Sequence, residues 1–272
     1  SFFMGYELDL RDAFPAQLEG ALSRRGIRAE ALNFSVSGFG TAEMLRAYEG
    51  YARKFEPDLV LFQWQSSDLD DNVRAGLYRL EQGRLVVAAT SYLPAVELQD
   101  YLMEFWVYRT LADHSHLYAF FRERLGRFAK EFLADLRRGR HAAAVDTTLA
   151  PLAPVAASAV NVETSGPEVL AAAILRRAQD EVAGDGRQFA VVEVPDQLGA
   201  TTFGSSWARL PPQSVAGIPV VLPLSSFDTL AATGERLYFD RGSFHLTPPA
   251  TRVLADLAAE QLTRIGLPER CK

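Results

Sequence analysis

The chain has 272 residues, of which 48% are apolar, and it carries a formal net charge of −6. This length and composition suffice for one large hydrophobic core, and the acidic balance argues against a nucleic-acid partner. Cys271 is the single cysteine, which excludes an internal disulfide and a thiolate metal cluster, and no apolar run reaches the roughly 18 residues of a membrane span.

The N-terminal region predicts a helix followed by a strand. Asp12 is a candidate N-cap for a helix that runs to about Arg25, with Gly26 as its stop signal. Residues Ala31 to Ser35 have the length and composition of a short strand.

A second helix and a buried strand are predicted next. Thr41 is expected to cap the helix. Its apolar stripe predicts core positions at Met44, Tyr48, Tyr51 and Phe55. The run from Asp58 to Trp64 is typical of a parallel strand buried on both faces, and the polar residues after it predict a loop.

The middle of the chain differs in composition from its flanks. Leu98 to Arg138 is rich in helix formers and aromatic residues. His141 to Val160 is rich in Ala, Pro and Thr and has no clear periodicity, which favours a loop or hinge.

The C-terminal region returns to alternating helix and strand. A helix is predicted over Glu168 to Glu181, and strands over Phe189 to Val194 and Ile218 to Leu222. Thr247 and Pro248 are typical of the start of a last helix. Its inner stripe is predicted at Leu254, Leu257, Ala258 and Ile265. This alternation favours an α/β fold with a parallel sheet and a site at the carboxyl ends of its strands.

Several short motifs occur in an order that resembles one enzyme family. They are Ser1 to Gly5, Asn33 to Thr41, Glu56 to Leu61, Gln65 to Asn72 and His245 to Pro248. Together they resemble the blocks of SGNH (GDSL-type) hydrolases.

The resemblance implies one domain over residues 1–272, a three-layer α/β/α sandwich of flavodoxin-like type. It also implies a helical insertion or cap over about residues 73–144. In the family a buried strand ending in Gly-Asp precedes the nucleophile. We therefore expect that strand to be missing here and the chain to be a fragment of a longer protein.

The resemblance assigns Ser1 as nucleophile and His245 as general base. A helix N-terminus after His245 should disfavour the imidazolium form and keep the base neutral. Asp240 is the nearest candidate for the triad acid, with a backbone carbonyl as the alternative group that orients His245. The competing interpretation of His245 is a hydrogen bond in a turn, and that of Asp240 is a turn carboxylate paired with Arg241.

The oxyanion hole departs from the family pattern. Gly38 occupies the position of its glycine donor, but Ser67 stands where the family carries asparagine. Loss of one such donor typically costs about 100 to 1,000-fold in rate, unless a neighbour such as Gln65 replaces it. Asp68, Asp71 and Asn72 match the end of this block, as loop-supporting residues or as turn formers.

We predict an enzyme that hydrolyses a small acyl or carbohydrate ester through an acyl-serine intermediate, without metal or cofactor. O-acyl transfer to a polysaccharide would use the same residues. The alternative from another class is a degenerate domain that binds a glycan or partner without turnover. A free α-amine at Ser1 acting as base, as in N-terminal nucleophile hydrolases, fits the motifs poorly. The resemblance slightly favours an extracytoplasmic location, and oligomeric state is not predicted.

Overall fold

The computed structural model describes residues 2–89, 166–239 and 245–266, together with Phe105, Trp106, Tyr108, Thr110 and Ser115. The chain divides into two compact units, one formed by residues 1–88 and 165–272 and the other by residues 89–164. All the motif residues belong to the first unit.

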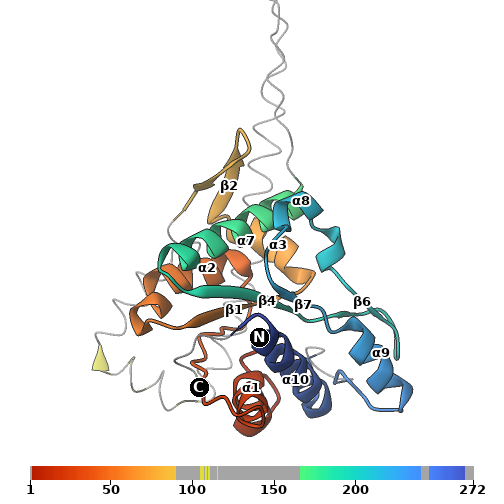
Figure 1. The fold of residues 1–272 in the computed structure, drawn as a ribbon. Coiled ribbons are helices and arrows are strands. Elements are labelled where there is room, and N and C mark those ends of the chain that lie inside the picture. Colours follow the sequence, from red (N-terminus) through yellow and green to blue (C-terminus); the bar gives the residue numbers. More distant parts are fainter. Residues whose placement is uncertain are drawn as a thin grey trace, which may run out of the picture. The chain divides into compact units, whose positions relative to one another are not determined.

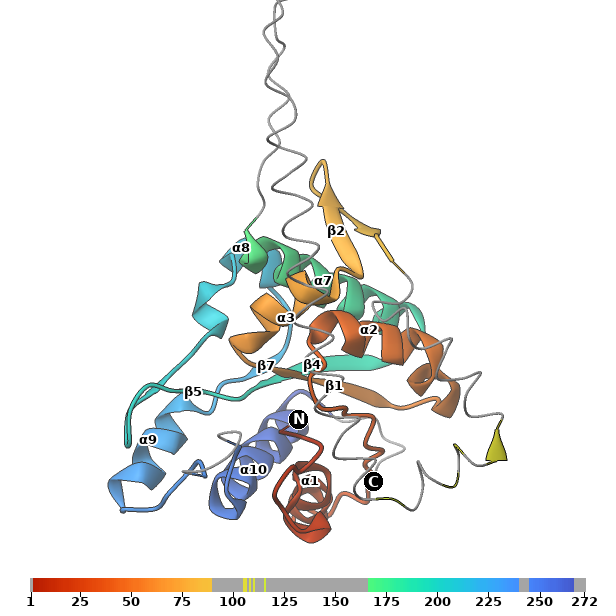
Figure 2. The ribbon, with the colours of Figure 1, turned by 180° about the vertical axis from the view of Figure 1, so that it is seen from behind.

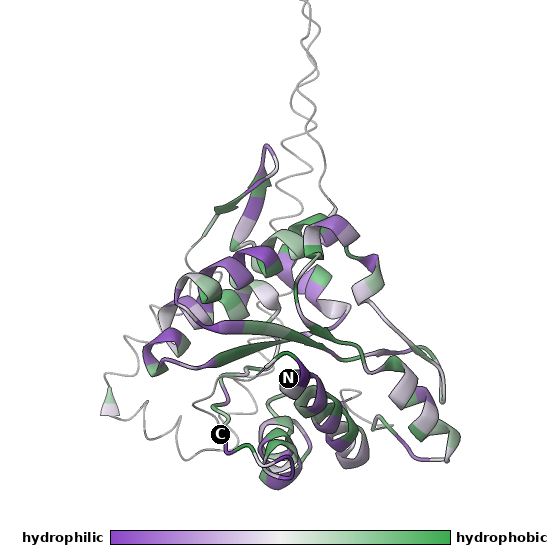
Figure 3. Ribbon diagram, viewed as in Figure 1, coloured by the Kyte–Doolittle hydropathy of each residue, from purple (hydrophilic) through white to green (hydrophobic). Residues whose placement is uncertain are grey.

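A parallel three-stranded sheet lies at the centre of the first unit (Figure 1). Its order is β1-β4-β7, where β1 is Leu59–Trp64, β4 is Gln188–Glu193 and β7 is Val220–Val221. Residues of β1 and β4 are paired from Leu59 with Gln188 to Trp64 with Glu193. Most residues of these strands are hydrophobic (Figure 3), as expected for a sheet covered on both faces. The predicted strands at residues 58–64, 189–194 and 218–222 and the parallel sheet are confirmed.

Helices cover both faces of this sheet (Figures 1 and 2). On one face lie α2 (Thr41–Gly50), α3 (Ser67–Ala75), α7 (Pro167–Gly184) and the short α8 (Pro212–Val215). On the other lie α1 (Phe14–Ser23), α9 (Leu224–Ala232) and α10 (Pro248–Arg264). The unit is therefore a mixed α/β structure with helices on both sides of a parallel sheet.

Smaller elements connect these layers. Three 3-10 helices span Leu10–Asp12 (η1), Ala52–Phe55 (η2) and Trp207–Arg209 (η3). Two antiparallel hairpins pair β2 (Tyr78–Glu81) with β3 (Arg84–Val87), and β5 (Asp196–Gln197) with β6 (Phe203–Gly204).

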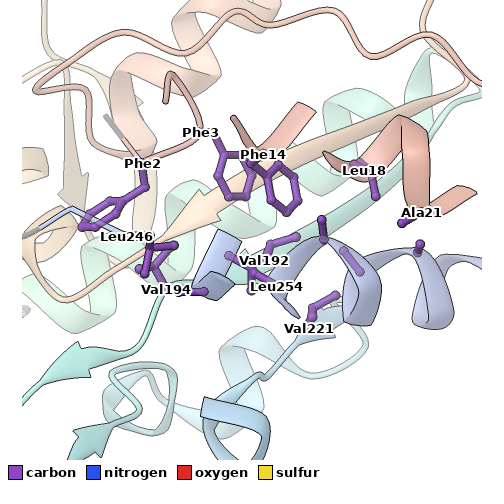
Figure 4. Close-up of a cluster of buried hydrophobic side chains, with 14 of the residues drawn as sticks. Phe2, Phe3, Phe14, Leu18, Ala21, Val192, Val194, Val221, Leu246 and Leu254 are labelled. Atoms are coloured by element: carbon purple, nitrogen blue, oxygen red, sulfur yellow. The ribbon is translucent and has the colours of Figure 1, made fainter. Parts of the chain in front are cut away.

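The core between the sheet and the α1/α10 layer includes the first residues of the chain (Figure 4). The ring of Phe3 stacks on that of Phe14 with 3.8 Å between centroids. Leu254 of α10 is fully buried in the same cluster. Burial of a side chain of this size contributes about 1.5–3 kcal/mol, so this cluster fixes the beginning of the chain against α1 and α10.

Two predictions about the start of the chain are wrong. Asp12 lies in η1, and Ala13 takes the N-cap position of α1. Residues 31–35 form no strand, because no neighbouring strand pairs with them in the described residues. Leu32 and Phe34 in this segment are instead 47% and 38% exposed.

Two apolar stripes are also shorter than predicted. Gly40, not Thr41, is the N-cap of α2, and that helix ends at Gly50. Tyr51 and Phe55 consequently leave the stripe and are 68% and 61% exposed. Ile265 follows the end of α10 and is 45% exposed.

The structure describes the predicted cap over residues 73–144 at its beginning, residues 73–89, and at five residues between 105 and 115. That beginning contains the end of α3 and the β2-β3 hairpin, which packs against α7. The predicted loop after Trp64 contains α3 itself. The predicted elements at residues 98–138 and 141–160 lie outside the described residues, apart from the five aromatic and hydroxyl residues between 105 and 115.

Candidate functional site

His245 lies between two aromatic side chains just before α10. Its ring centroid is 4.9 Å from that of Phe2 and 5.0 Å from that of Tyr6. The residue is 6% exposed, and this burial lowers the pKa of the imidazole below its ordinary value. Neutral imidazole, the form that accepts a proton, is therefore favoured near neutral pH.

A backbone pairing holds His245 in place. The Phe239 N–H donates to the His245 carbonyl at 3.0 Å, and Tyr238 forms an antiparallel bridge with Leu246. Thr247 is the N-cap of α10 and Pro248 its first residue, as predicted, but the Thr247 hydroxyl donates to the Arg236 carbonyl. The turn before α10 is thus fixed to the segment that precedes it.

The beginning of the chain reaches both His245 and the sheet. Phe2 contacts the imidazole, and the next residue, Phe3, donates its backbone N–H to Gln63 Oε1 of β1 at 3.3 Å. Ser1 and Asp240 lie outside the described residues. Phe2, the neighbour of the predicted nucleophile Ser1, is therefore in direct contact with the predicted base His245.

The segment that contains Gly38 also contacts the start of the chain. Asn33 Nδ2 donates to the Phe3 carbonyl at 3.3 Å. Gly38 is exposed and has a φ of 78°, in the left-handed region where glycine meets no steric penalty. This conformation accounts for glycine at the predicted oxyanion position.

The loop after β1 forms a compact turn with its own side chains. The Ser67 hydroxyl is exposed and donates to Gln65 Oε1 at 2.9 Å. Asp68 is 2% exposed and accepts the Gln65 backbone N–H at 3.0 Å. Burial raises the pKa of Asp68 well above its ordinary value, so its position is that of a buried structural carboxyl group.

Asn72 joins the loop segments of the second and third motifs. Its Oδ1 accepts the Ala42 backbone N–H at 2.8 Å, and its Nδ2 donates to the Thr41 hydroxyl at 2.8 Å. Asp71 forms an ion pair with Arg74 at 2.6 Å. Asn72 thus caps α2 from α3, which fixes the loop before α2 relative to the loop before α3.

Two carboxylates that sequence reasoning missed lie at the carboxyl end of β4 and just after it. Glu193 is fully buried, and its Oε1 accepts the Ser205 hydroxyl and the Trp207 backbone N–H, both at 2.8 Å. Burial raises the pKa of Glu193. Asp196 accepts the Ser66 hydroxyl at 2.5 Å. A glutamate at the end of an apolar strand was the available signal for Glu193, because strand ends carry the sites of parallel sheets.

Two buried polar atoms at this end of the sheet have no hydrogen-bond partner in the part of the chain that the structure describes. They are Glu193 Oε2 and Trp64 Nε1, from paired residues of neighbouring strands. A buried polar atom that forms no hydrogen bond destabilises the folded state, because it has lost its hydrogen bonds to water.

No three His, Cys, Asp or Glu side chains among the described residues are arranged to hold a metal ion. None of the described helices combines the length and the apolarity needed to cross a membrane. Comparisons of the chain with protein-family models, with curated proteins and with solved structures returned no match.

Proposed function

We propose that this protein is a serine esterase of SGNH type that acts on a small acyl or carbohydrate ester. The observation that carries the proposal is the contact between Phe2 and His245, whose ring centroids are 4.9 Å apart. It brings the residue next to Ser1 against a buried imidazole whose pKa is lowered by burial. A serine hydroxyl needs such a base to become an effective nucleophile.

In the proposed reaction, Ser1 Oγ attacks the ester carbonyl carbon while His245 takes the hydroxyl proton. The tetrahedral intermediate collapses, the alcohol leaves with the proton from His245, and an acyl-serine remains. Water, activated by the same imidazole, then releases the carboxylic acid and restores Ser1. If a sugar hydroxyl replaces water, the same intermediate gives O-acyl transfer.

The supporting roles follow the sequence motifs. Gly38 donates its backbone N–H to the oxyanion, and Asp240 orients His245. Asp68, Asp71 and Asn72 support the loops, in keeping with the bonds of Asp68 and Asn72 to neighbouring backbone. The proposed fold of the full domain is the three-layer SGNH sandwich with its cap.

A second candidate function is favoured by one contact. The Ser67 hydroxyl donates to Gln65 Oε1, and a hydroxyl has only one proton to donate. In this arrangement Ser67 donates nothing to an oxyanion. A degenerate domain that binds a glycan or partner without turnover accounts for this arrangement.

Hydrolysis of p-nitrophenyl acetate and butyrate separates the two functions. We expect turnover by the protein, its loss by at least about 1,000-fold in Ser1→Ala and His245→Ala, and no change in the control Ser225→Ala, whose side chain is exposed on α9. Labelling of the protein, but not of Ser1→Ala, by a fluorophosphonate probe gives an independent readout. A folded protein that neither turns over these esters nor reacts with the probe contradicts the esterase proposal and favours binding.

A further inference from the structure

A side-chain hydrogen bond to Asp196, in the segment after β4, joins that segment to the loop after β1. The Asp196 carboxylate accepts the Ser66 hydroxyl at 2.5 Å, across 130 positions of the sequence. Ser66 is the N-cap of α3 and lies between Gln65 and Ser67. A hydrogen bond to a charged acceptor is roughly twice as strong as a neutral one, so this contact fixes the position of the loop.

The residue before Asp196 is linked to His245. The Tyr238 hydroxyl donates to the Pro195 carbonyl, and Tyr238 is 3% exposed. Tyr238 also forms the backbone bridge with Leu246, directly after His245. The Asp196 side chain therefore contacts the loop after β1, and the Pro195 carbonyl contacts Tyr238, which pairs with the residue after His245.

We propose that Asp196 is a positioning residue for ester hydrolysis, and that Pro195 and Asp196 together set the loop of Ser67 relative to His245. The inference rests on the proposed function. Misplacement of reacting groups by about 1 Å can cost on the order of 100-fold in rate, so a link of this kind affects turnover without touching substrate.

The test is a double-mutant cycle with Asp196→Ala and Ser66→Ala, measured as kcat and KM on p-nitrophenyl acetate. Each single variant should lower kcat by about 10-fold and change KM by less than about 2-fold, because the geometry of the reacting groups changes and substrate contacts do not. The double variant should be no slower than either single variant, since all three lack the same hydrogen bond. Asp196→Asn keeps an acceptor oxygen and should restore kcat to within about 3-fold of the parent.

Asp228→Ala and Ser225→Ala are matched controls, because both side chains are exposed on α9. Tyr238→Phe removes only the hydroxyl that reaches Pro195 and should likewise lower kcat while changing KM by less than about 2-fold. Where Asp196→Ala does not fold, Ser66→Ala and Asp196→Asn decide the question.

The parent protein and His245→Ala are measured first, so the two proposals fail separately. A parent without esterase activity overturns the proposed function and this inference with it. An active, His245-dependent parent whose Ser66→Ala and Asp196→Ala variants keep kcat overturns the inference alone. A double variant whose fold-loss of kcat equals the product of the two single fold-losses also overturns the inference. So does a loss of kcat that is fully explained by unfolding of the variant.

Discussion

At the scale of single residues, the environment of His245 determines its charge. Two aromatic rings approach the imidazole and leave it 6% exposed, and desolvation disfavours its charged form. The nearby α10 N-terminus acts in the same direction, as the position of Thr247 and Pro248 predicts. A base that is neutral near pH 7 results from burial by residues far away in the sequence.

Truncating one of these rings should raise the pKa of His245. Tyr6 is 41% exposed, so Tyr6→Ala admits water to the imidazole without opening the core. We expect the pKa of His245 to move up towards its ordinary value of about 6.5, and the acid limb of kcat/KM to move to higher pH with it. NMR titration of the imidazole, assigned with His245→Ala, measures the shift.

The control is Tyr51→Ala, which removes an aromatic ring that is 68% exposed at the C-terminal end of α2. It should leave the titration unchanged. A downward shift in Tyr6→Ala, or equal shifts in both variants, would contradict desolvation as the cause.

At the scale of elements, the packing of α2 against α3 depends on a glycine. Gly40 has a φ of −91°, which any residue adopts, so the reason for glycine there is space. A Cβ at position 40 would lie 2.9 Å from Asp71 Cβ and 3.0 Å from Asn72 Oδ1. The same asparagine caps α2, so an added methyl group would strain the cap as well as the packing.

Gly40→Ala should therefore destabilise the protein by about 1–3 kcal/mol, the usual cost of overpacking. Gly50→Ala is the matched control, since no atom lies within 4 Å of its added Cβ at the end of the same helix. That substitution should be neutral or stabilise by up to about 1 kcal/mol, because alanine loses less backbone entropy on folding. Urea denaturation of both variants measures the difference. Equal effects would show that space at position 40 is not limiting.

The elements also show what the sequence can predict. The strands β1 and β4 and the helix α10 are found because a local apolar run or a local cap determines each of them. The wrong strand at residues 31–35 has the right composition, but a strand forms only with a partner. The helix α3 was missed because its Ser, Asp and Asn residues are typical of turns, whereas here Asp68 bonds locally to Gln65 and Asn72 makes a tertiary contact with α2.

The candidate site shows the same division. His245 and Gly38 were predicted from motifs, and the structure places the neighbours of Ser1 beside His245 and beside the segment of Gly38. Asp196 and Glu193 belong to no motif, and their roles depend on Ser66, Ser205 and Trp207. Only the fold brings these residues together, so the sequence indicates at most the strand-end position of Glu193 and none of these hydrogen bonds.

At the scale of the whole molecule, a buried carboxyl group at the carboxyl end of the central strand makes stability depend on pH. Burial raises the pKa of Glu193 in the folded state above its unfolded value of about 4.3. At pH values between these two pKa values, the folded state then binds more protons than the unfolded state. The contribution of Glu193 to the free energy of unfolding is thus most favourable below its pKa in the unfolded state, and it is lost as pH rises through its pKa in the folded state.

Glu193→Gln should remove this dependence. The amide keeps the oxygen that accepts the Ser205 and Trp207 bonds, and it carries no charge. We expect the variant to be more stable than the parent by about 1–3 kcal/mol at pH 8, and by less at pH 5. Free energies of unfolding between pH 5 and 8 test this, with Glu235→Gln, an exposed residue, as control. Parallel curves for Glu193→Gln and the parent would exclude Glu193 as the source of the pH dependence.

The pairing of Trp64 with Glu193 also has an optical consequence. Trp64 is fully buried, whereas Trp106 is 71% exposed, so their emission spectra differ in wavelength. The ring of Trp64 also lies edge-on to that of Trp207, with 6.2 Å between centroids, and the Trp207 backbone binds Glu193. Ionisation of Glu193 places a full charge close to the indoles of Trp64 and Trp207. The fluorescence of the buried Trp64, at shorter wavelength, should therefore report the ionisation of Glu193 at the carboxyl end of the sheet.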